Sequence, residues 1–159
     1  MKYILSAALM ALVCAFPAVA SSSLETAWKS ISSIKGFDVE AAPASMFNFP
    51  DSFGDGQLAV HPNASMCKEI TAVLDALSDD YLLGALSDES FDERLFVESL
   101  PDGGCVMLYT IVGTGGADTV AFMANITEEQ ADEVASLWES HIKQEEEGKE
   151  EFDQDFGDE

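Results

Sequence analysis

The stretch between Arg94 and Ile126 restricts the possible folds of this chain more than any other part of the sequence. It contains three runs rich in apolar and β-branched residues, at residues 94–98, 105–112 and 119–126. Pro101–Gly104 separates the first two runs, and Gly113–Asp118 separates the last two. Both separators predict tight turns, because proline presets φ and glycine permits positive φ. The stretch is therefore expected to form a three-strand antiparallel meander.

Capping boxes predict where two helices begin. The S/T-x-x-E/Q pattern, in which the two polar residues satisfy each other's backbone donors, occurs at Ser22–Glu25 and at Thr127–Gln130. Apolar residues follow each box at helical spacing, and Gly36 stands where the first helix should end. The segment Asn63–Leu77 carries a similar apolar stripe, which predicts a further helix.

The remaining elements complete the expected fold class. Short strands are predicted at residues 37–40 and 57–61, whereas residues 81–86 are ambiguous. The fold is therefore expected to be α+β, with an antiparallel sheet packed against about three helices. That sheet would consist of the three-strand meander plus one or two short strands.

The first twenty residues have the layout of a secretory signal peptide. Lys2 is followed by an apolar run and by the small-x-small ending Ala18-Val19-Ala20. The run is shorter than the roughly 20 apolar residues that a membrane-spanning helix needs. We therefore expect cleavage after Ala20, export to the periplasm or beyond, and no membrane insertion of the mature chain. Cys14 offers lipidation as an alternative, although Val13 before it is a poor fit for a lipidation signal.

The mature chain is strongly acidic. The sequence has 30 acidic and 7 basic residues, and only Lys2 precedes the cleavage site, which leaves a formal charge of 6 − 30 = −24. Phosphate binding needs Lys and Arg gathered on one face, so nucleic acid and anionic membranes are not expected as partners. Solubility and mutual repulsion explain the charge. A cationic partner is the functional alternative.

The charge is concentrated at the C-terminal end. Residues 144–159 contain nine acidic residues and one lysine. Such a run cannot bury enough apolar surface to fold, so it predicts a disordered acidic tail. Weak association of divalent cations with this tail is expected at most. The chain would thus divide into a signal peptide (residues 1–20), one α+β domain (residues 21–143) and the tail (residues 144–159).

The meander also carries a resemblance. A helix, then RLFVESL-PDGG-CVMLYTIV-GTGGAD-TVAFMANI, then the capped helix TEEQADEVASLW, resembles small exported or lipid-anchored bacterial proteins classified as a domain of unknown function. The similarity covers about Leu24–Ile142 in element order and is specific only in the meander. The missing lipidation motif departs from the lipid-anchored relatives. The family supplies no activity or catalytic residue to carry over.

Two cysteines, Cys67 and Cys105, remain after signal cleavage. In an oxidising compartment such a pair predicts a disulfide. Closing a loop of about 38 residues would stabilise the fold by roughly 4 kcal/mol. Two buried free thiols are the alternative, because cysteine packs well as a small apolar residue.

The sequence contains no recognisable catalytic pattern. His61 and His141 are its only histidines, and nothing places both beside a carboxylate or cysteine at ligand spacing, so no metal site is expected. There is no G-x-S-x-G nucleophile motif. Gly113–Asp118 begins like a dinucleotide-binding loop, but Asp118 takes the place of the third glycine and a strand follows. No catalytic residue and no cofactor are therefore expected.

The best candidate for a binding surface is the segment Ala41–Gly56. Its large apolar residues include Met46, Phe47 and Phe49, which lie between prolines and glycines. Long loops in compact domains are often functional, although these side chains could instead cap the open end of the sheet. We expect an exported, non-enzymatic interaction module for an unknown protein or envelope component. The alternatives are an acidic cation-buffering or solubilising factor and an enzyme with an unrecognised site.

Overall fold

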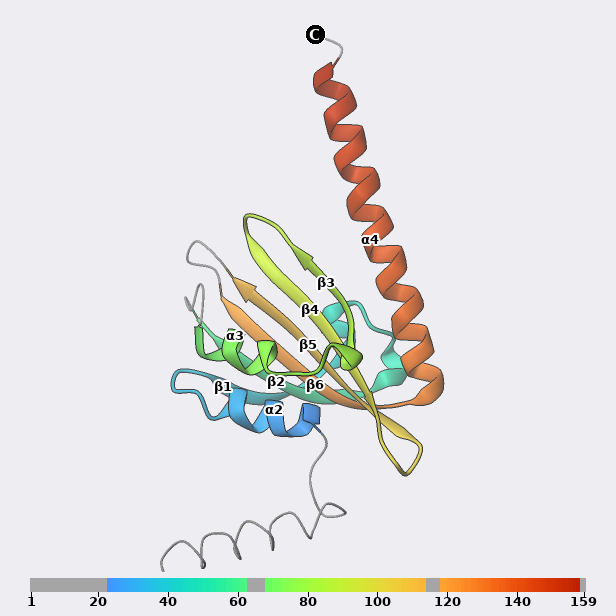
Figure 1. The fold of residues 1–159 in the computed structure, drawn as a ribbon. Helices are drawn as coiled ribbons and strands as arrows, with labels where there is room; N and C mark the ends of the chain where they lie inside the picture. The colour runs from blue at the N-terminus through green and yellow to red at the C-terminus, as the bar shows by residue number, and fades with distance from the viewer. Residues whose placement is uncertain (1–22, 63–67, 114–117, 158–159) are drawn as a thin grey trace, which may run out of the picture.

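A six-stranded antiparallel sheet forms the centre of the molecule (Figure 1). The computed structural model describes residues 23–62, 68–113 and 118–157. The strands follow the order β1-β2-β6-β5-β4-β3 across the sheet. Their bounds are β1 Asp38–Pro43, β2 Asp55–His61, β3 Leu82–Ser87, β4 Phe91–Ser99, β5 Gly104–Gly113 and β6 Thr119–Thr127. Strands β4, β5 and β6 are the predicted meander, which confirms the expected fold class.

The short strands extend the meander on both sides. Strands β1 and β2 correspond to the two predicted short strands, and β2 pairs with β6. The ambiguous segment at residues 81–86 becomes the edge strand β3, whose register with β4 shifts between Leu82 and Gly84. That irregularity explains why the segment lacks a clear alternating pattern.

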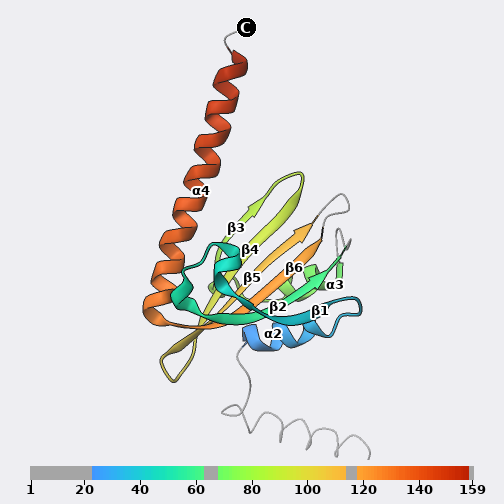
Figure 2. The same cartoon turned by 180° about the vertical axis from the view of Figure 1, so that it is seen from behind.

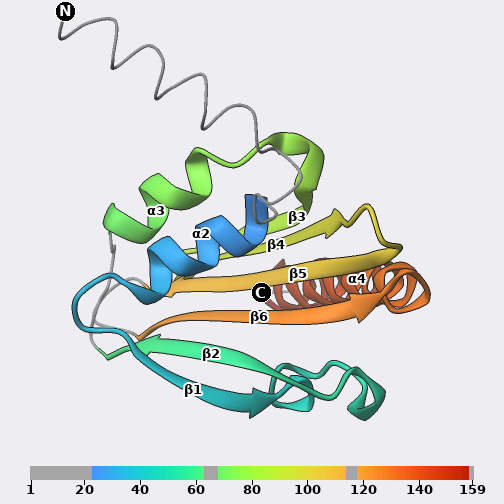
Figure 3. The ribbon, with the colours of Figure 1, turned by 90° about the horizontal axis from the view of Figure 1, so that it is seen from below.

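Helices cover both faces of the sheet (Figures 2 and 3). The described α-helices are α2 Ser23–Ser32, α3 Lys68–Asp75 and α4 Glu128–Gly157, and the short 3-10 helices are η2 Ala44–Phe47, η3 Asp51–Phe53 and η4 Asp79–Tyr81. Helices α2 and α3 pack on one face, which we call the α2 face. Helix α4 packs with η2 and η3 on the other, the α4 face. No helix within the described ranges is both long and apolar enough to cross a membrane.

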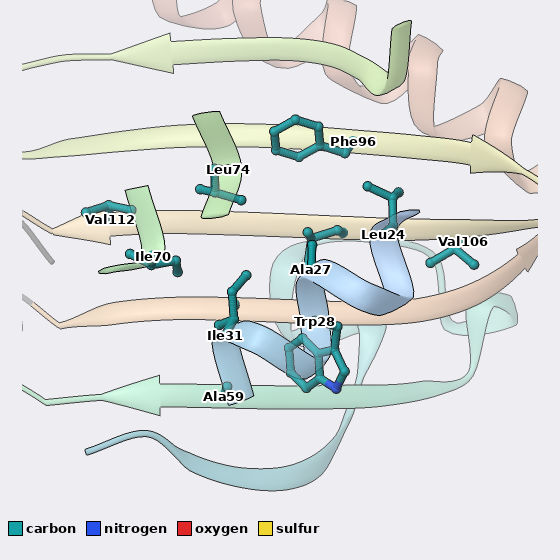
Figure 4. Packing of buried hydrophobic residues seen from close by; sticks show 12 residues of the cluster. Leu24, Ala27, Trp28, Ile31, Ala59, Ile70, Leu74, Phe96, Val106 and Val112 are labelled. Carbon is teal, nitrogen blue, oxygen red and sulfur yellow. The ribbon is translucent and has the colours of Figure 1, made fainter. Parts of the chain in front are cut away.

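The central strand β5 is buried on both sides, as its apolar sequence predicts. Val106 and Leu108 belong to the core under α2 and α3, whereas Cys105 and Met107 belong to the core under α4. On the α2 face, side chains from both helices interlock over the strands (Figure 4). Alternate residues of one strand therefore stabilise two separate cores.

The start of α2 is fixed by a residue far away in the sequence. Both carboxylate oxygens of Glu98 in β4 accept backbone hydrogen bonds, from Ser23 at 3.1 Å and from Leu24 at 3.0 Å. They satisfy N–H groups that have no partner inside the helix, and negative charge suits the positive end of the helix dipole. Ser22 of the predicted capping box lies outside the described residues.

The start of α4 confirms the second capping box. Gln130 accepts a hydrogen bond from the backbone of Thr127 at 3.0 Å, and the Thr127 hydroxyl accepts one from the backbone of Gln130 at 3.1 Å. The helix then continues to Gly157 and leaves the sheet (Figure 1). In place of the predicted disorder, the structure thus has helical backbone from Gln144 to Gly157. Glu, Gln and Lys dominate this segment, and all three have high helix propensity.

Candidate functional site

A pocket opens on the α4 face between α4, strands β4 and β5, and the loop after β1. Its volume is about 300 Å³. Aromatic rings form much of its wall, and the rest includes a few polar groups and aliphatic side chains. The aromatic members are Phe47, Phe49, Tyr109 and Trp138, and the polar members include Asn48, Glu93, Ser140, His141 and Gln144. We call this site the aromatic pocket.

The loop that supplies Phe47 and Phe49 is shorter than the sequence predicts, because β1 runs to Pro43 and β2 begins at Asp55. Asn48 ends the 3-10 helix η2 with a positive φ of 64°. This left-handed turn, which asparagine tolerates better than most residues, separates Phe47 from Phe49. A hydrogen bond of 2.9 Å from the backbone of Ala44 to Gly54 closes the loop.

The structure separates the three residues of the predicted binding surface. Phe47 and Phe49 are half-buried, and both contact the Tyr109 ring edge-on at centroid distances of 5.5 and 5.7 Å. Phe47 also packs on Phe122 at 5.1 Å. Met46 is 57% exposed and does not line the aromatic pocket. The two phenylalanines therefore serve both the core and the pocket wall.

The floor of the pocket holds a buried carboxylate. Glu93 is 5% exposed, because its position in β4 faces the apolar core under α4. Tyr109 in β5 stands diagonally across from it, since Leu95 pairs with Tyr109 and Glu93 pairs with Ile111. The Tyr109 hydroxyl donates a hydrogen bond to Glu93 Oε1. Diagonal neighbours of this kind are within reach of long side chains.

The Tyr109 phenol is held in its protonated form. Burial raises its pKa above the ordinary value of 10.0, and the hydrogen bond to the Glu93 carboxylate and the negative charge of Glu93 raise it further. A phenolate beside a carboxylate would place two like charges together in a poorly solvated site. Tyr109 is consequently a hydrogen-bond donor here and is unsuited to act as a base or nucleophile.

Helix α4 completes the pocket with Trp138 and His141. These residues are three positions apart, so they share one face of the helix, and their rings lie 5.6 Å apart. His141 Nε2 is 3.4 Å from Glu93 Oε2, a contact that becomes an ion pair when His141 is protonated.

Trp138 fits closely against the edge of the sheet. Its indole lies against Gly84 of β3, where a Cβ atom would overlap the ring. Its Nε1 atom is buried and has no hydrogen-bond partner among the described residues. The absence of a side chain at Gly84 therefore sets how closely α4 approaches β3.

The sequence pattern missed Glu93, Tyr109, Trp138 and His141 as a group. The sequence did contain one indication of the site: Glu93 places a carboxylate on the strand face that also carries Leu95 and Val97. The predicted strand began at Arg94, so this alternation could not be seen. Within the described ranges, no group of three His, Cys, Asp or Glu side chains is placed to hold a metal ion.

A second hollow of about 290 Å³ lies on the α2 face between α3 and β4. Arg94 contacts Asp75 at 2.8 Å and Asp92 at 3.1 Å, and Asp79 also lines this hollow. These two ion pairs engage Arg94 and two of the three carboxylates that line the hollow. The aromatic pocket is the better candidate site, because a single carboxylate stands there among aromatic rings.

The disulfide between Cys67 and Cys105 stays a prediction. Cys67 lies outside the described residues, and Cys105 is buried in the core under α4 with no disulfide to a described residue. Helix α3, which begins at Lys68, packs on the opposite face. Thiol titration of residues 21–159, denatured without reductant, would find no thiol if the bridge forms and two if both cysteines are free.

Comparison of this chain with protein-family models, with curated proteins and with solved structures found no significant match. The resemblance in the meander therefore remains a prediction. The aromatic pocket is the feature of the described residues on which a proposed function can rest.

Proposed function

We propose that this chain is an exported, non-enzymatic binding protein and that the aromatic pocket is its ligand site. The observation that carries the proposal is the combination of a cavity of about 300 Å³, aromatic walls and the buried carboxylate of Glu93. Ligand sites are typically concave and mostly apolar, with a few polar groups that orient the ligand. The partner would be a protein or another envelope component that inserts a group into this pocket.

The energetics of Glu93 support a functional role. Removing a carboxylate from water is costly even when hydrogen bonds compensate part of the loss. A well-packed apolar residue at the same position would commonly give equal or greater stability. A fold that retains Glu93 beneath a cavity is thus better explained by recognition of a ligand than by packing alone.

Export is part of this proposal and rests on the layout of residues 1–20. The acidic composition supports an alternative role as a cation-buffering or solubilising factor. Calcium titration by calorimetry separates the two roles. Buffering predicts many weak sites whose number falls when Glu145–Glu159 is removed, whereas a binding protein needs no calcium response.

A pair of serine substitutions tests the pocket directly. Ser140 lines the aromatic pocket, and Ser136 lies one turn earlier on α4 outside it. Both are exposed, and each hydroxyl donates to the carbonyl four residues earlier, so the two positions are closely matched. Ser140→Phe should fill the pocket and abolish specific capture from envelope extract, whereas Ser136→Phe should capture like the wild type.

Two results would contradict the proposal. Equal capture by the wild type and by Ser140→Phe would remove the pocket from the binding site. Loss of capture in Ser136→Phe as well would indicate a wider surface on α4. The melting temperature of each variant shows whether it is folded.

One observation favours a second candidate, an enzyme. Glu93 and His141 are the kinds of group that transfer protons, and they meet beside the cavity at 3.4 Å. Mass spectrometry of the captured ligand before and after incubation distinguishes the candidates. An enzyme would alter the ligand and would lose that activity in Glu93→Gln, whereas a binding protein returns the ligand unchanged.

A further inference from the structure

The charge of the aromatic pocket limits what it can hold. No lysine or arginine lines it, and Tyr109 is neutral because its phenol stays protonated. When His141 is neutral, Glu93 is the only charged side chain in the wall. A cationic group would neutralise this carboxylate, whereas an anionic group would be repelled by it. The overall charge of the chain, −23, also favours a positively charged ligand.

The aromatic walls favour the same kind of ligand. Phe47, Phe49, Tyr109 and Trp138 come from a loop, a strand and a helix and surround one cavity. Aromatic faces carry partial negative charge and attract organic cations, most strongly at sites shielded from water. A carboxylate and several rings that share one cavity thus attract a cation in two independent ways.

The hydrogen bonds of Glu93 distinguish between kinds of cation. A primary ammonium has three N–H donors that need acceptors. In this pocket Oε1 of Glu93 already accepts from Tyr109, and Oε2 faces His141 at 3.4 Å. A quaternary ammonium has no N–H donors, so it needs only the charge and the aromatic surface. It would leave the contacts of Glu93 in place.

We propose that the aromatic pocket binds a quaternary ammonium group. This inference rests on the proposed function and specifies the ligand of that site. Such a group could belong to a free metabolite or to a lipid headgroup. Choline and short-chain phosphatidylcholine below its micellar concentration serve as probes for these two sources.

The two tryptophans give a readout for the ligand. Trp138 lines the pocket, whereas Trp28 lies on the α2 face and donates a hydrogen bond of 2.8 Å to Gln57. Choline is titrated into the ¹⁵N-labelled exported chain. It should shift the indole N–H signal of Trp138 and leave that of Trp28 unchanged.

Three matched comparisons test the chemistry. The neutral isostere 3,3-dimethylbutanol and the primary amine of N-acetyl-lysine methylamide should each bind at least about tenfold more weakly than choline. Glu93→Gln should weaken choline binding by a similar factor, whereas Glu139→Gln, which removes one exposed charge of α4 outside the pocket, should not. Ser140→Phe should abolish the Trp138 shift, and Ser136→Phe should retain it.

Each contrary result has a definite meaning. If the isostere binds as well as choline, or if Glu93→Gln binds choline normally, the inference is wrong. If neither choline nor phosphatidylcholine binds while Ser140→Phe still blocks capture from extract, the proposed binding function stands and the ligand class is wrong. If Ser140→Phe changes neither the Trp138 shift caused by choline nor the capture from envelope extract, both proposals fail together.

Discussion

Glu98 of strand β4 accepts a hydrogen bond from the backbone N–H of Leu24 at 3.0 Å, across 74 residues of sequence. Glu98 is 8% exposed, and its other oxygen accepts the backbone N–H of Ser23. One buried carboxylate thus caps α2 and attaches it to the sheet. In addition to the packing of the core, this contact links the first described helix to the meander.

Replacing Glu98 by alanine should destabilise the domain by about 1–3 kcal/mol, because the buried N–H of Leu24 and the partly buried N–H of Ser23 lose a charged acceptor. Glu98→Gln should lie between the alanine variant and the wild type, since the amide keeps one acceptor oxygen. Urea denaturation measures both changes. Glu133→Ala on the exposed side of α4 is the control and should stay within about 0.5 kcal/mol of the wild type. Equal stability of Glu98→Ala and this control would show that the cap contributes nothing.

Gly84→Ala should destabilise the domain by about 1–3 kcal/mol, because its Cβ would overlap the indole of Trp138 and move α4 away from β3. The indole signal of Trp138 should shift in the same variant. Gly104→Ala is the matched control, since a Cβ there would meet its nearest atom only at 3.8 Å. A normal melting temperature for Gly84→Ala would mean that α4 is not held against β3.

Tyr109 should resist ionisation in the folded state. Burial and then Glu93 raise its pKa above 10.0, so absorbance at 295 nm should show phenolate from Tyr109 only after alkaline unfolding. The folded state holds this proton more tightly than the unfolded state. Its contribution to stability is therefore complete below about pH 10 and declines as pH rises above it.

Two variants assign that signal. Tyr109→Phe should remove the delayed absorbance step, and Tyr81→Phe should leave it unchanged. Glu93→Gln removes the charge but not the burial, so the pKa of Tyr109 should fall and still remain above 10.0. A single early titration step for all tyrosines of the wild type would contradict the proposed geometry.

Truncation after Gln144 should leave the melting temperature within a few degrees, because Ile142 is the last of the described α4 side chains that packs against the core. The far-UV signal at 222 nm should decrease, since the deletion removes the helical residues from 145 to 157. A large fall in melting temperature would show that this part of α4 docks on the domain. An unchanged signal at 222 nm would show that the segment is disordered in solution, as the sequence predicts.

The sequence by itself determined the elements that depend on local chemistry. Turn residues and apolar runs predicted β4, β5 and β6, and the Thr127–Gln130 capping box predicted the start of α4. These features depend on residues within a few positions of each other, so their pattern is visible in the chain. The aromatic character of the loop after β1 was visible for the same reason.

Only the tertiary structure decided which residues form the pocket. Glu93 and His141 are 48 residues apart, and Phe47 and Tyr109 are further apart still. The register of β4 on β5 places Glu93 beside Tyr109, and the small size of Gly84 allows Trp138 and the rest of α4 to approach. Local patterns fix helices, turns and strands, but a binding site arises from contacts between elements. Strand register and packing distance set those contacts, and a single sequence does not reveal either one.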